Sequence, residues 1–466
     1  MKTKYARLIK DTFIFALGSV GSKIILFFLV PLYTNCLTQE QYGTADLIFT
    51  VAQVIIPICS LVIFDAVVRF GLEKQANKGN VLLVALLIWL GGSIVALFLM
   101  PLTALNATVE NWKWYLYFYI TLNMLLSILL NYNKVKQKNS LYSITCIIQT
   151  IVLALLNIYL LLIKKTGVEG YLLSNLIAAG IAIIVSIVFS GLIGDLRNAE
   201  FDRNLMKNMV LYSAPLIFNN LAWWVIQSSD KVMIEILLGE AMVGLYGAAT
   251  RIPSLINVFV SIFQQSWGIS AITEIDTNMD GDKEFYSQVF SVFTFLVLFA
   301  CIFVNSIVKY FMRIYVGADF YEAWTFVPLL VCAAAFSAIA AYFGSIYGAL
   351  KKSTNNMITT VVAGIINIVV NMLLIPVMGV EGAVVGTIVS YFILAFVRMK
   401  DCLRFVKIDI DLFRLLSNSI IIIMHGILIT LDVNAILCSI IAIMLFISVN
   451  YRTLRIIFNR ILLKRK

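Results

Sequence analysis

Residues 167–193 read GVEGYLLSNLIAAGIAIIVSIVFSGLI, and Glu169 is the one ionisable side chain in this run. About 20 consecutive apolar residues are enough for a helix to cross the hydrocarbon core of a bilayer. The run therefore predicts a transmembrane helix. Its opening tetrapeptide, Gly167-Val168-Glu169-Gly170, returns as Gly379-Val380-Glu381-Gly382 at the start of another long apolar run.

Similar apolar runs recur along the whole chain of 466 residues, of which 61% are hydrophobic and 13% charged. A soluble globular protein has roughly twice that charged fraction. The composition therefore predicts an all-α polytopic membrane protein. We expect fourteen spans: 11–36, 42–70, 80–103, 112–133, 141–163, 168–193, 209–238, 242–270, 286–308, 324–350, 356–377, 380–400, 411–432 and 433–452.

Basic residues gather in alternate loops between these spans. One set of loops contains Lys134, Lys136 and Lys138, then Lys351 and Lys352, and Arg398 with the residues after it. The short turns 37–41, 239–241 and 379–382 on the opposite side lack Lys and Arg. The positive-inside rule then places both termini in the cytoplasm. We interpret the net charge of +10 as topology and contact with anionic lipid, not as nucleic-acid binding.

The repeated tetrapeptide belongs to a longer internal repeat. Lys138-Asn139-Ser140 matches Lys352-Ser353-Thr354, and the Leu and Gly of 37–43 match those of 238–244. An even number of spans in each half predicts a parallel duplication, for which the substrate path is expected between the halves. The predicted architecture is therefore two pseudo-symmetric six-helix lobes, 1–200 and 201–405. Residues 406–466 are expected to add two transmembrane helices and a basic cytoplasmic tail.

Several ionisable residues fall inside the predicted spans, where a charge costs roughly 2.5–3.5 kcal/mol. Asp65 and Arg69 are four residues apart, as are Lys231 and Glu235, so each pair can form an ion pair along its own helix. A purely structural pair remains an alternative for both. Lys23 and Arg251 have no carboxylate three or four residues away. Arg251 is close enough to the outer end of its span to reach the interface, which is an alternative for this residue.

The predicted seventh and eighth spans each carry a polar stripe. These stripes are Asn220, Trp224, Gln227, Lys231 and Glu235 on one span, and Arg251, Ser254, Ser261 and Gln265 on the other. Polar stripes on apolar helices face the bundle interior or a watery cavity, although hydrogen-bonded helix packing also explains Asn and Ser.

Bases in such a cavity are suited to an anionic substrate such as a phosphate. The substrate-binding candidates are Lys23, Arg69, Gln227, Lys231, Arg251 and Gln265. The candidates for coupling to a proton or sodium ion are Asp46, Asp65, Asp230 and Glu235. We see no nucleophile motif, metal-ligand cluster or cofactor motif, so no catalytic residue, metal or cofactor is predicted.

The chain also resembles a known family in short motifs near the start of each half. These are Gly21-Ser22-Lys23, Pro31-Leu32-Tyr33-Thr34 and Tyr42-Gly43-Thr44-Ala45-Asp46-Leu47, then Ser229-Asp230-Lys231, Val243-Gly244-Leu245-Tyr246 and Ala249-Thr250-Arg251. They resemble the Wzx-type polysaccharide flippases of the multidrug/oligosaccharidyl-lipid/polysaccharide exporter superfamily, which includes the MATE antiporters and the lipid II flippase.

The resemblance implies a MATE-like fold in the bacterial inner membrane. It implies transport of an undecaprenyl-pyrophosphate-linked oligosaccharide to the outer leaflet for O-antigen, capsule or exopolysaccharide synthesis, with a polysaccharide polymerase as partner. Family cavities tend to be cationic, which fits Lys23, Lys231 and Arg251. Many relatives have twelve spans, so the two C-terminal spans are a departure from the family pattern.

Two other functions are consistent with a protein of this kind. A multidrug antiporter of the same superfamily would need an acidic cavity for cationic drugs. A polysaccharide polymerase or ligase would need a large outer loop, and the loops 103–112 and 309–323 are short. A flippase that works by alternating access is therefore the preferred interpretation.

Overall fold

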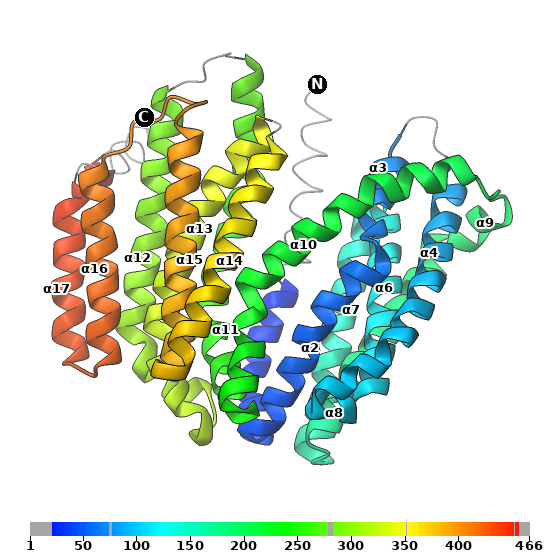
Figure 1. The fold of residues 1–466 in the computed structure, drawn as a ribbon, viewed down its shortest axis with the longest axis horizontal. Coiled ribbons are helices and arrows are strands. Elements are labelled where there is room, and N and C mark those ends of the chain that lie inside the picture. Colours follow the sequence, from blue (N-terminus) through cyan, green and yellow to red (C-terminus); the bar gives the residue numbers. More distant parts are fainter. Residues whose placement is uncertain (1–20, 74–76, 278–282, 351, 452, 456–466) are drawn as a thin grey trace. The chain divides into compact units, whose positions relative to one another are not determined.

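The computed structural model describes residues 21–73, 77–277, 283–350, 352–451 and 453–455, without the side chains of residues 265, 266, 268–277 and 353. In this part of the chain, twelve helices are long and apolar enough to cross a membrane. Two shorter apolar helices, Gly21–Cys36 and Ala435–Val449, complete the set. Each of the fourteen predicted spans overlaps one of these helices, and the predicted all-α membrane fold is confirmed (Figure 1).

The chain forms two compact units, Met1–Trp224 and Val225–Lys466, and the division falls inside α10 (Arg203–Leu238). The predicted lobe boundaries, 1–200, 201–405 and 406–466, stay a prediction. The first unit contains Gly21–Cys36, α2 (Gln39–Ser60), α3 (Ile63–Gly71), α4 (Lys78–Leu99), η1 (Met100–Leu105), α5 (Ala107–Asn111), α6 (Lys113–Val135), α7 (Asn139–Asn157), η2 (Ile158–Ile163), α8 (Val168–Ser190) and α9 (Leu192–Arg197).

The second unit continues with α11 (Glu240–Thr277), α12 (Lys283–Tyr315), η3 (Ala318–Thr325), α13 (Val327–Ala349), α14 (Ser353–Met378), α15 (Val380–Cys402), α16 (Leu412–Thr430) and α17 (Ala435–Val449). The mostly buried helix α13 is central, because it packs against α11, α12, α15 and α16. The C-terminal helices α16 and α17 pack against each other and against α12.

The second predicted span, 42–70, is two helices rather than one. Leu61 and Val62 both have left-handed backbone angles, with φ of 49° and 52°, and they separate α2 from α3. Such angles are costly for a side chain branched at Cβ, so the break is held by its surroundings. Val62 is fully buried, and its N–H donates to the hydroxyl of Ser60 at 3.1 Å.

The internal repeat is visible in the backbone. Gly167 (φ 62°, ψ −141°) and Gly379 (φ 64°, ψ −140°) precede α8 and α15 with nearly the same angles. Lys138 (φ −91°, ψ 57°) and Lys352 (φ −96°, ψ 53°) likewise precede α7 and α14. The matches between these turns in the sequence therefore reflect the same local structure in both units.

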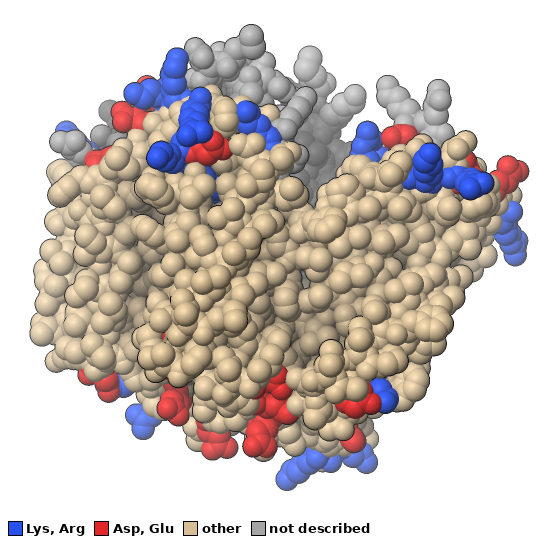
Figure 2. All heavy atoms as spheres, viewed as in Figure 1, with Lys and Arg blue, Asp and Glu red and all other residues tan. Residues whose placement is uncertain are grey.

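Charged side chains gather at the ends of the helices in each unit, and the surface between those ends is almost free of them (Figure 2). Many large apolar side chains of the long helices are exposed, for example Ile184 on α8 and Met372 and Leu373 on α14. A surface of this kind is suited to contact with lipid tails. The chain is therefore a multi-pass membrane protein.

Arg398 differs from its predicted role as a charge in a cytoplasmic loop. It lies inside α15 and is 1% exposed. Its guanidinium donates to the carbonyl oxygen of Ala340 at 3.1 Å and to the hydroxyl of Thr360 at 2.8 Å. It also donates to the hydroxyl of Thr359 at 3.1 Å and to the carbonyl oxygen of Asn356 at 3.3 Å. The pattern of loop charges missed this burial because the neutral partners of the arginine lie on α13 and α14.

Candidate functional site

Lys23 is an exposed base on an apolar helix of the first unit. The hydroxyl of the preceding residue, Ser22, donates to the carbonyl oxygen of Cys146 on α7 at 3.4 Å. Lys23 itself is exposed, and no carboxylate of the described residues lies within 4.0 Å of its ammonium group. A charge on such a helix needs water or an anion. The first unit therefore presents one base that is suited to an anionic headgroup.

The predicted ion pair between Asp65 and Arg69 is wrong. In the structure Arg69 pairs with Glu73 at 3.1 Å, and both side chains are at least half exposed. Glu73 lies beyond the end of α3, where its longer side chain reaches back to the arginine one turn earlier. Asp65 is also exposed, and it interacts electrostatically with Lys134 of α6. The ion pair of Arg69 with Glu73 thus replaces the predicted one.

The remaining predicted substrate-binding and coupling residues whose side chains the structure describes are less exposed than Lys23, except for Gln227. Asp46 is buried in α2, at 6% exposure. Lys231 and Glu235 on α10 and Arg251 on α11 are half-buried, and none of these residues is without a partner. Gln227 is exposed on α10. The side chain of Gln265 lies outside the described residues.

Asp230 lies in a buried polar cluster of the second unit, which we call the Asp230 cluster and define as Ser229, Asp230, Tyr246, Asn367, Asn371 and Thr387. Asp230 is 2% exposed, and its Oδ2 accepts a hydrogen bond from the hydroxyl of Tyr246 on α11. Its Oδ1 accepts the backbone N–H of Lys231 at 2.9 Å. A buried carboxylate requires such partners, because its desolvation is otherwise too costly.

The amides of α14 form the second half of this cluster. Asn367 Oδ1 accepts hydrogen bonds from the hydroxyl of Ser229 at 3.2 Å and from Asn371 Nδ2 at 3.2 Å. Both asparagines are fully buried, and Nδ2 of Asn367 and Oδ1 of Asn371 have no hydrogen-bond partner in the described part of the chain. A buried polar atom without a partner costs free energy, so this cluster is an unusual feature of the packing.

A glycine makes room for these amides. A Cβ atom at Gly386 of α15 would lie 1.9 Å from Asn371 Oδ1, so any other residue at this position requires the Asn371 side chain to move. A Cβ atom at Gly382 would meet the backbone of Leu374 at 2.4 Å. The sequence analysis missed Asn367 and Asn371. Their spacing of four residues on an apolar helix was the signal that could have found them.

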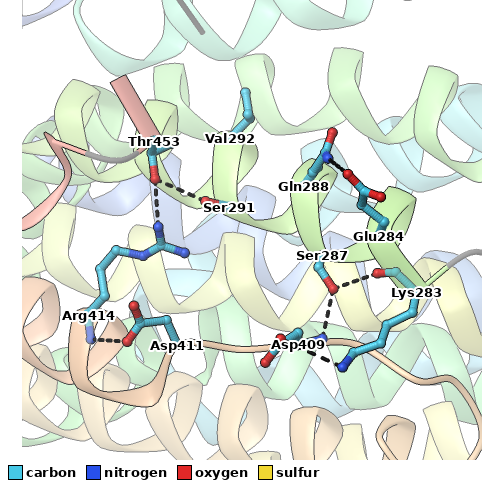
Figure 3. A pocket seen from close by; sticks show the side chains of 10 residues that line it. All are labelled: Lys283, Glu284, Ser287, Gln288, Ser291, Val292, Asp409, Asp411, Arg414 and Thr453. Carbon is cyan, nitrogen blue, oxygen red and sulfur yellow. Dashed lines mark hydrogen bonds and ion pairs between the residues drawn. The ribbon is translucent and has the colours of Figure 1, made fainter. Parts of the chain in front are cut away.

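A separate cavity of about 810 Å³ lies where α12, α16 and α17 meet (Figure 3). Its charged groups bind one another: Lys283 pairs with Asp409 at 3.7 Å, and Arg414 donates to the hydroxyl of Thr453 at 2.7 Å. Asp411 accepts the N–H at the start of α16. No predicted site residue lines this cavity. It is therefore a weak candidate for the substrate site.

A family model described as polysaccharide biosynthesis protein matches residues 8–268, which is more than half of the chain. No curated protein matches the chain.

Solved structures of transporters have the same fold. An inward-facing multidrug resistance MATE family transporter of the MOP superfamily has a TM-score of 0.73 at 11% identity, over 82% of this chain and 94% of that one. The lipid II flippase MurJ, in an inward closed conformation, has a TM-score of 0.69 at 15% identity, over 97% of this chain and 100% of that one. A MOP superfamily transporter from Pyrococcus furiosus, whose structure was described as having a binding pocket of reverse polarity, has a TM-score of 0.61 at 11% identity, over 84% of this chain and 94% of that one.

These TM-scores show a shared fold, and the match to the family model is independent of them. Both agree with the resemblance carried by the motifs at the start of each half, so that expectation is confirmed. The chain belongs to the family of polysaccharide biosynthesis proteins, built on the fold of MOP superfamily transporters.

Proposed function

We propose that the chain is a flippase that carries an undecaprenyl-pyrophosphate-linked oligosaccharide from the inner to the outer leaflet of the bacterial plasma membrane. The observation that carries this proposal is a polysaccharide biosynthesis family match on a fold similar to that of a lipid II flippase. The product would serve the synthesis of O-antigen, capsule or exopolysaccharide. The protein moves its substrate by alternating access and performs no chemistry on it.

Basic side chains bind the pyrophosphate in this proposal. Lys23 supports it most directly, because it is exposed on an apolar helix and no described carboxylate lies near it. Lys231 and Arg251 supply further positive charge, while Gln227 and Gln265 offer hydrogen bonds to sugar hydroxyls. Arg69 contributes only when it exchanges its partner Glu73 for the substrate.

Asp230 is the coupling residue that we favour among Asp46, Asp65, Asp230 and Glu235. Its buried carboxylate accepts a hydrogen bond from Tyr246, and the neighbouring Ser229 binds the amide oxygen of Asn367. Carboxylate, hydroxyl and amide oxygens are the kind of ligands that a hard cation such as sodium takes. Binding a cation there changes the charge of the second unit and can bias its conformation.

Charge reversal tests the substrate-binding proposal. We expect Lys23→Glu and Arg251→Glu each to abolish surface polysaccharide while protein levels stay normal, and the lipid-linked oligosaccharide to accumulate on the inner leaflet. Arg197→Glu, which reverses an exposed charge at the end of α9, is the matched control and should leave polysaccharide unchanged. Normal polysaccharide in both test variants would remove the role of these bases.

Ion dependence tests the coupling proposal separately. Asp230→Asn should lower the rate of translocation in proteoliposomes at least tenfold and remove its response to a sodium or proton gradient. Glu200→Gln, at an exposed position, should leave both unchanged. A variant Asp230→Asn that still responds to the gradient excludes Asp230 as the coupling residue.

A multidrug antiporter is the second candidate function, because a MATE transporter has a similar fold at a TM-score of 0.73. Deletion of the gene distinguishes the two functions. We expect loss of surface polysaccharide with unchanged drug susceptibility, whereas an antiporter would show the opposite result.

A further inference from the structure

We propose that the second unit binds an anionic phospholipid on the surface of α15. The headgroup lies beside Lys400 and Arg404, and one acyl chain enters a crevice that α16 forms with α13 and α15. This site is distinct from the residues proposed to bind the transported substrate.

The polar part of the site is a cavity of about 440 Å³ between α14 and α15. Lys400 is exposed, and no carboxylate of the described residues lies within 4.0 Å of it. The side chain of Arg404 is 69% exposed and pairs with Asp401 at 3.6 Å. Asp401 is also bound by the hydroxyl of Tyr347 at 2.8 Å and by Asn355 Nδ2 at 2.9 Å. The two bases and one acid leave a positive charge at the cavity.

The apolar part is a crevice of about 210 Å³ that α15 forms with α13 and α16. Phe396 lines both cavities and is half exposed, so the two cavities adjoin at this side chain. The other lining residues include Phe336 of α13, Phe392 and Met399 of α15, and Leu412 and Leu416 of α16. A hydrocarbon chain is suited to such a lining, because burial of apolar surface favours its binding.

The ligand that fits both parts is an amphiphile with a negative headgroup. Basic pockets between helices at the cytoplasmic side bind anionic lipid headgroups, and the end of α15 is predicted to be cytoplasmic. The cavity of Figure 3 lacks this combination, because its bases Lys283 and Arg414 are outnumbered by three acids, Glu284, Asp409 and Asp411. Charge complementarity therefore favours the α15 site.

The basic cavity also contacts the buried arginine that joins three helices. Thr359 lines the cavity, and its hydroxyl accepts a hydrogen bond from Arg398 Nε at 3.1 Å. Arg398 in turn binds Ala340 of α13 and Thr360 of α14. A lipid in this cavity would therefore restrain α14 and α15 at the point where Arg398 holds them together.

Native mass spectrometry of the full-length protein in a neutral detergent tests the proposal, with phosphatidylglycerol and phosphatidylcholine as probes. We expect the wild type to retain phosphatidylglycerol in preference to phosphatidylcholine. The double variant Lys400→Gln/Arg404→Gln should weaken phosphatidylglycerol binding roughly 30-fold, at a contribution of about 1 kcal/mol for each base. The control Arg197→Gln/Arg203→Gln removes two exposed bases elsewhere and should leave binding unchanged.

A second variant tests the acyl-chain crevice. Leu416 is 55% exposed at the crevice, so Leu416→Trp should fill it without disturbing the core and should weaken phosphatidylglycerol binding as well. Equal binding by the wild type and the double variant overturns the proposal, as does unchanged binding by Leu416→Trp. A competition between undecaprenyl phosphate and phosphatidylglycerol gives a further test. If excess phosphatidylglycerol fails to displace bound undecaprenyl phosphate from this site, the occupant is the carrier lipid and the proposal is overturned.

Discussion

The two units share a backbone pattern and differ in the polar groups that it holds. Counted from Gly167 and Gly379, residue 398 of the second unit corresponds to residue 186 of the first, because both follow the glycine by the same number of residues. Ser186 is fully buried and accepts one hydrogen bond from Asn133 Nδ2 at 2.8 Å. Arg398 instead binds four acceptors on two other helices. At this position the duplicated scaffold thus has one neutral hydrogen bond in the first unit and a buried charge with four acceptors in the second.

The same difference recurs at the lipid site and at the Asp230 cluster. Lys400 and Arg404 correspond to Val188 and Leu192 of the first unit, so only the second unit carries bases at these positions. Counted from Leu37 and Leu238, Asp230 and Tyr246 correspond to Leu29 and Ala45, which are both buried and apolar. Asp230 and the two bases of the proposed lipid site therefore have no charged counterpart in the first unit.

The strongest test of this comparison is the removal of the buried contacts. Arg398→Ala leaves several buried acceptors without a donor and opens a cavity, so we expect a loss of about 3 kcal/mol in the free energy of unfolding. Ser186→Ala removes one hydrogen bond and should cost about 1 kcal/mol. The measurement is the shift in Tm of the purified protein in detergent. Equal shifts in the two variants contradict the assigned difference between the units.

The next test exchanges Gly386 and the corresponding residue of the first unit, Ser174, so that each position receives the residue of the other. Residue 174 of the first unit, which corresponds to Gly386, is a buried serine that donates to the carbonyl oxygen of Gly170 at 2.7 Å. Gly386→Ser places a side chain on Asn371 and should cost about 2 kcal/mol by overpacking. Ser174→Gly should cost about 1 kcal/mol, because glycine lowers the stability of a helix. Thermal unfolding measures both, and a neutral Gly386→Ser shows that the α14–α15 contact is not tight.

The turns before α8 and α15 have the same conformation in both units. Substitutions at these turns should therefore destabilise the two units equally. Gly167 and Gly379 have backbone angles that other residues adopt only with strain. Gly167→Ala and Gly379→Ala should each cost about 1–2 kcal/mol, and the two costs should agree within about 0.5 kcal/mol. Tm measurements on the two variants and the wild type test this. A large effect at one turn and none at the other breaks the equivalence of the units.

The sequence predicted the helices and the repeat well, because apolar length and turn motifs are local properties. It predicted the site less well for reasons that are tertiary. The ion pair of Asp65 and Arg69 was wrong because a third charge, Glu73, competes one turn later. The burial of Arg398 was missed because its acceptors are neutral groups on neighbouring helices. Asn367 and Asn371 were missed because their amides can be buried together only where Gly386 of the neighbouring helix leaves room for Asn371.

The smallest expected effect concerns an acid outside the membrane-spanning helices. Asp195 of α9 accepts hydrogen bonds from Lys136 Nζ at 2.7 Å and from the hydroxyl of Tyr132 at 2.7 Å. Partial burial raises the pKa of Asp195, but the bonds from Lys136 and Tyr132 outweigh this effect, so the pKa lies below the ordinary value for aspartate. In the second unit Tyr347 and Asn355 bind Asp401 in a similar way.

A lowered pKa in the folded state means that the charged carboxylate stabilises the fold. The contribution is complete above the ordinary aspartate pKa of about 3.9, and it is lost as the pH falls through the lower pKa of the folded state. Asp195→Asn should therefore cost about 1 kcal/mol or less at pH 7, and its Tm should approach that of the wild type below about pH 4. The measurement is Tm against pH for both proteins, with Glu200→Gln as the control at an exposed position. If the difference in Tm between the wild type and Asp195→Asn stays constant with pH, the charge of Asp195 does not hold α9. Hydrogen-bond geometry then holds this helix, because only the charge titrates in this range.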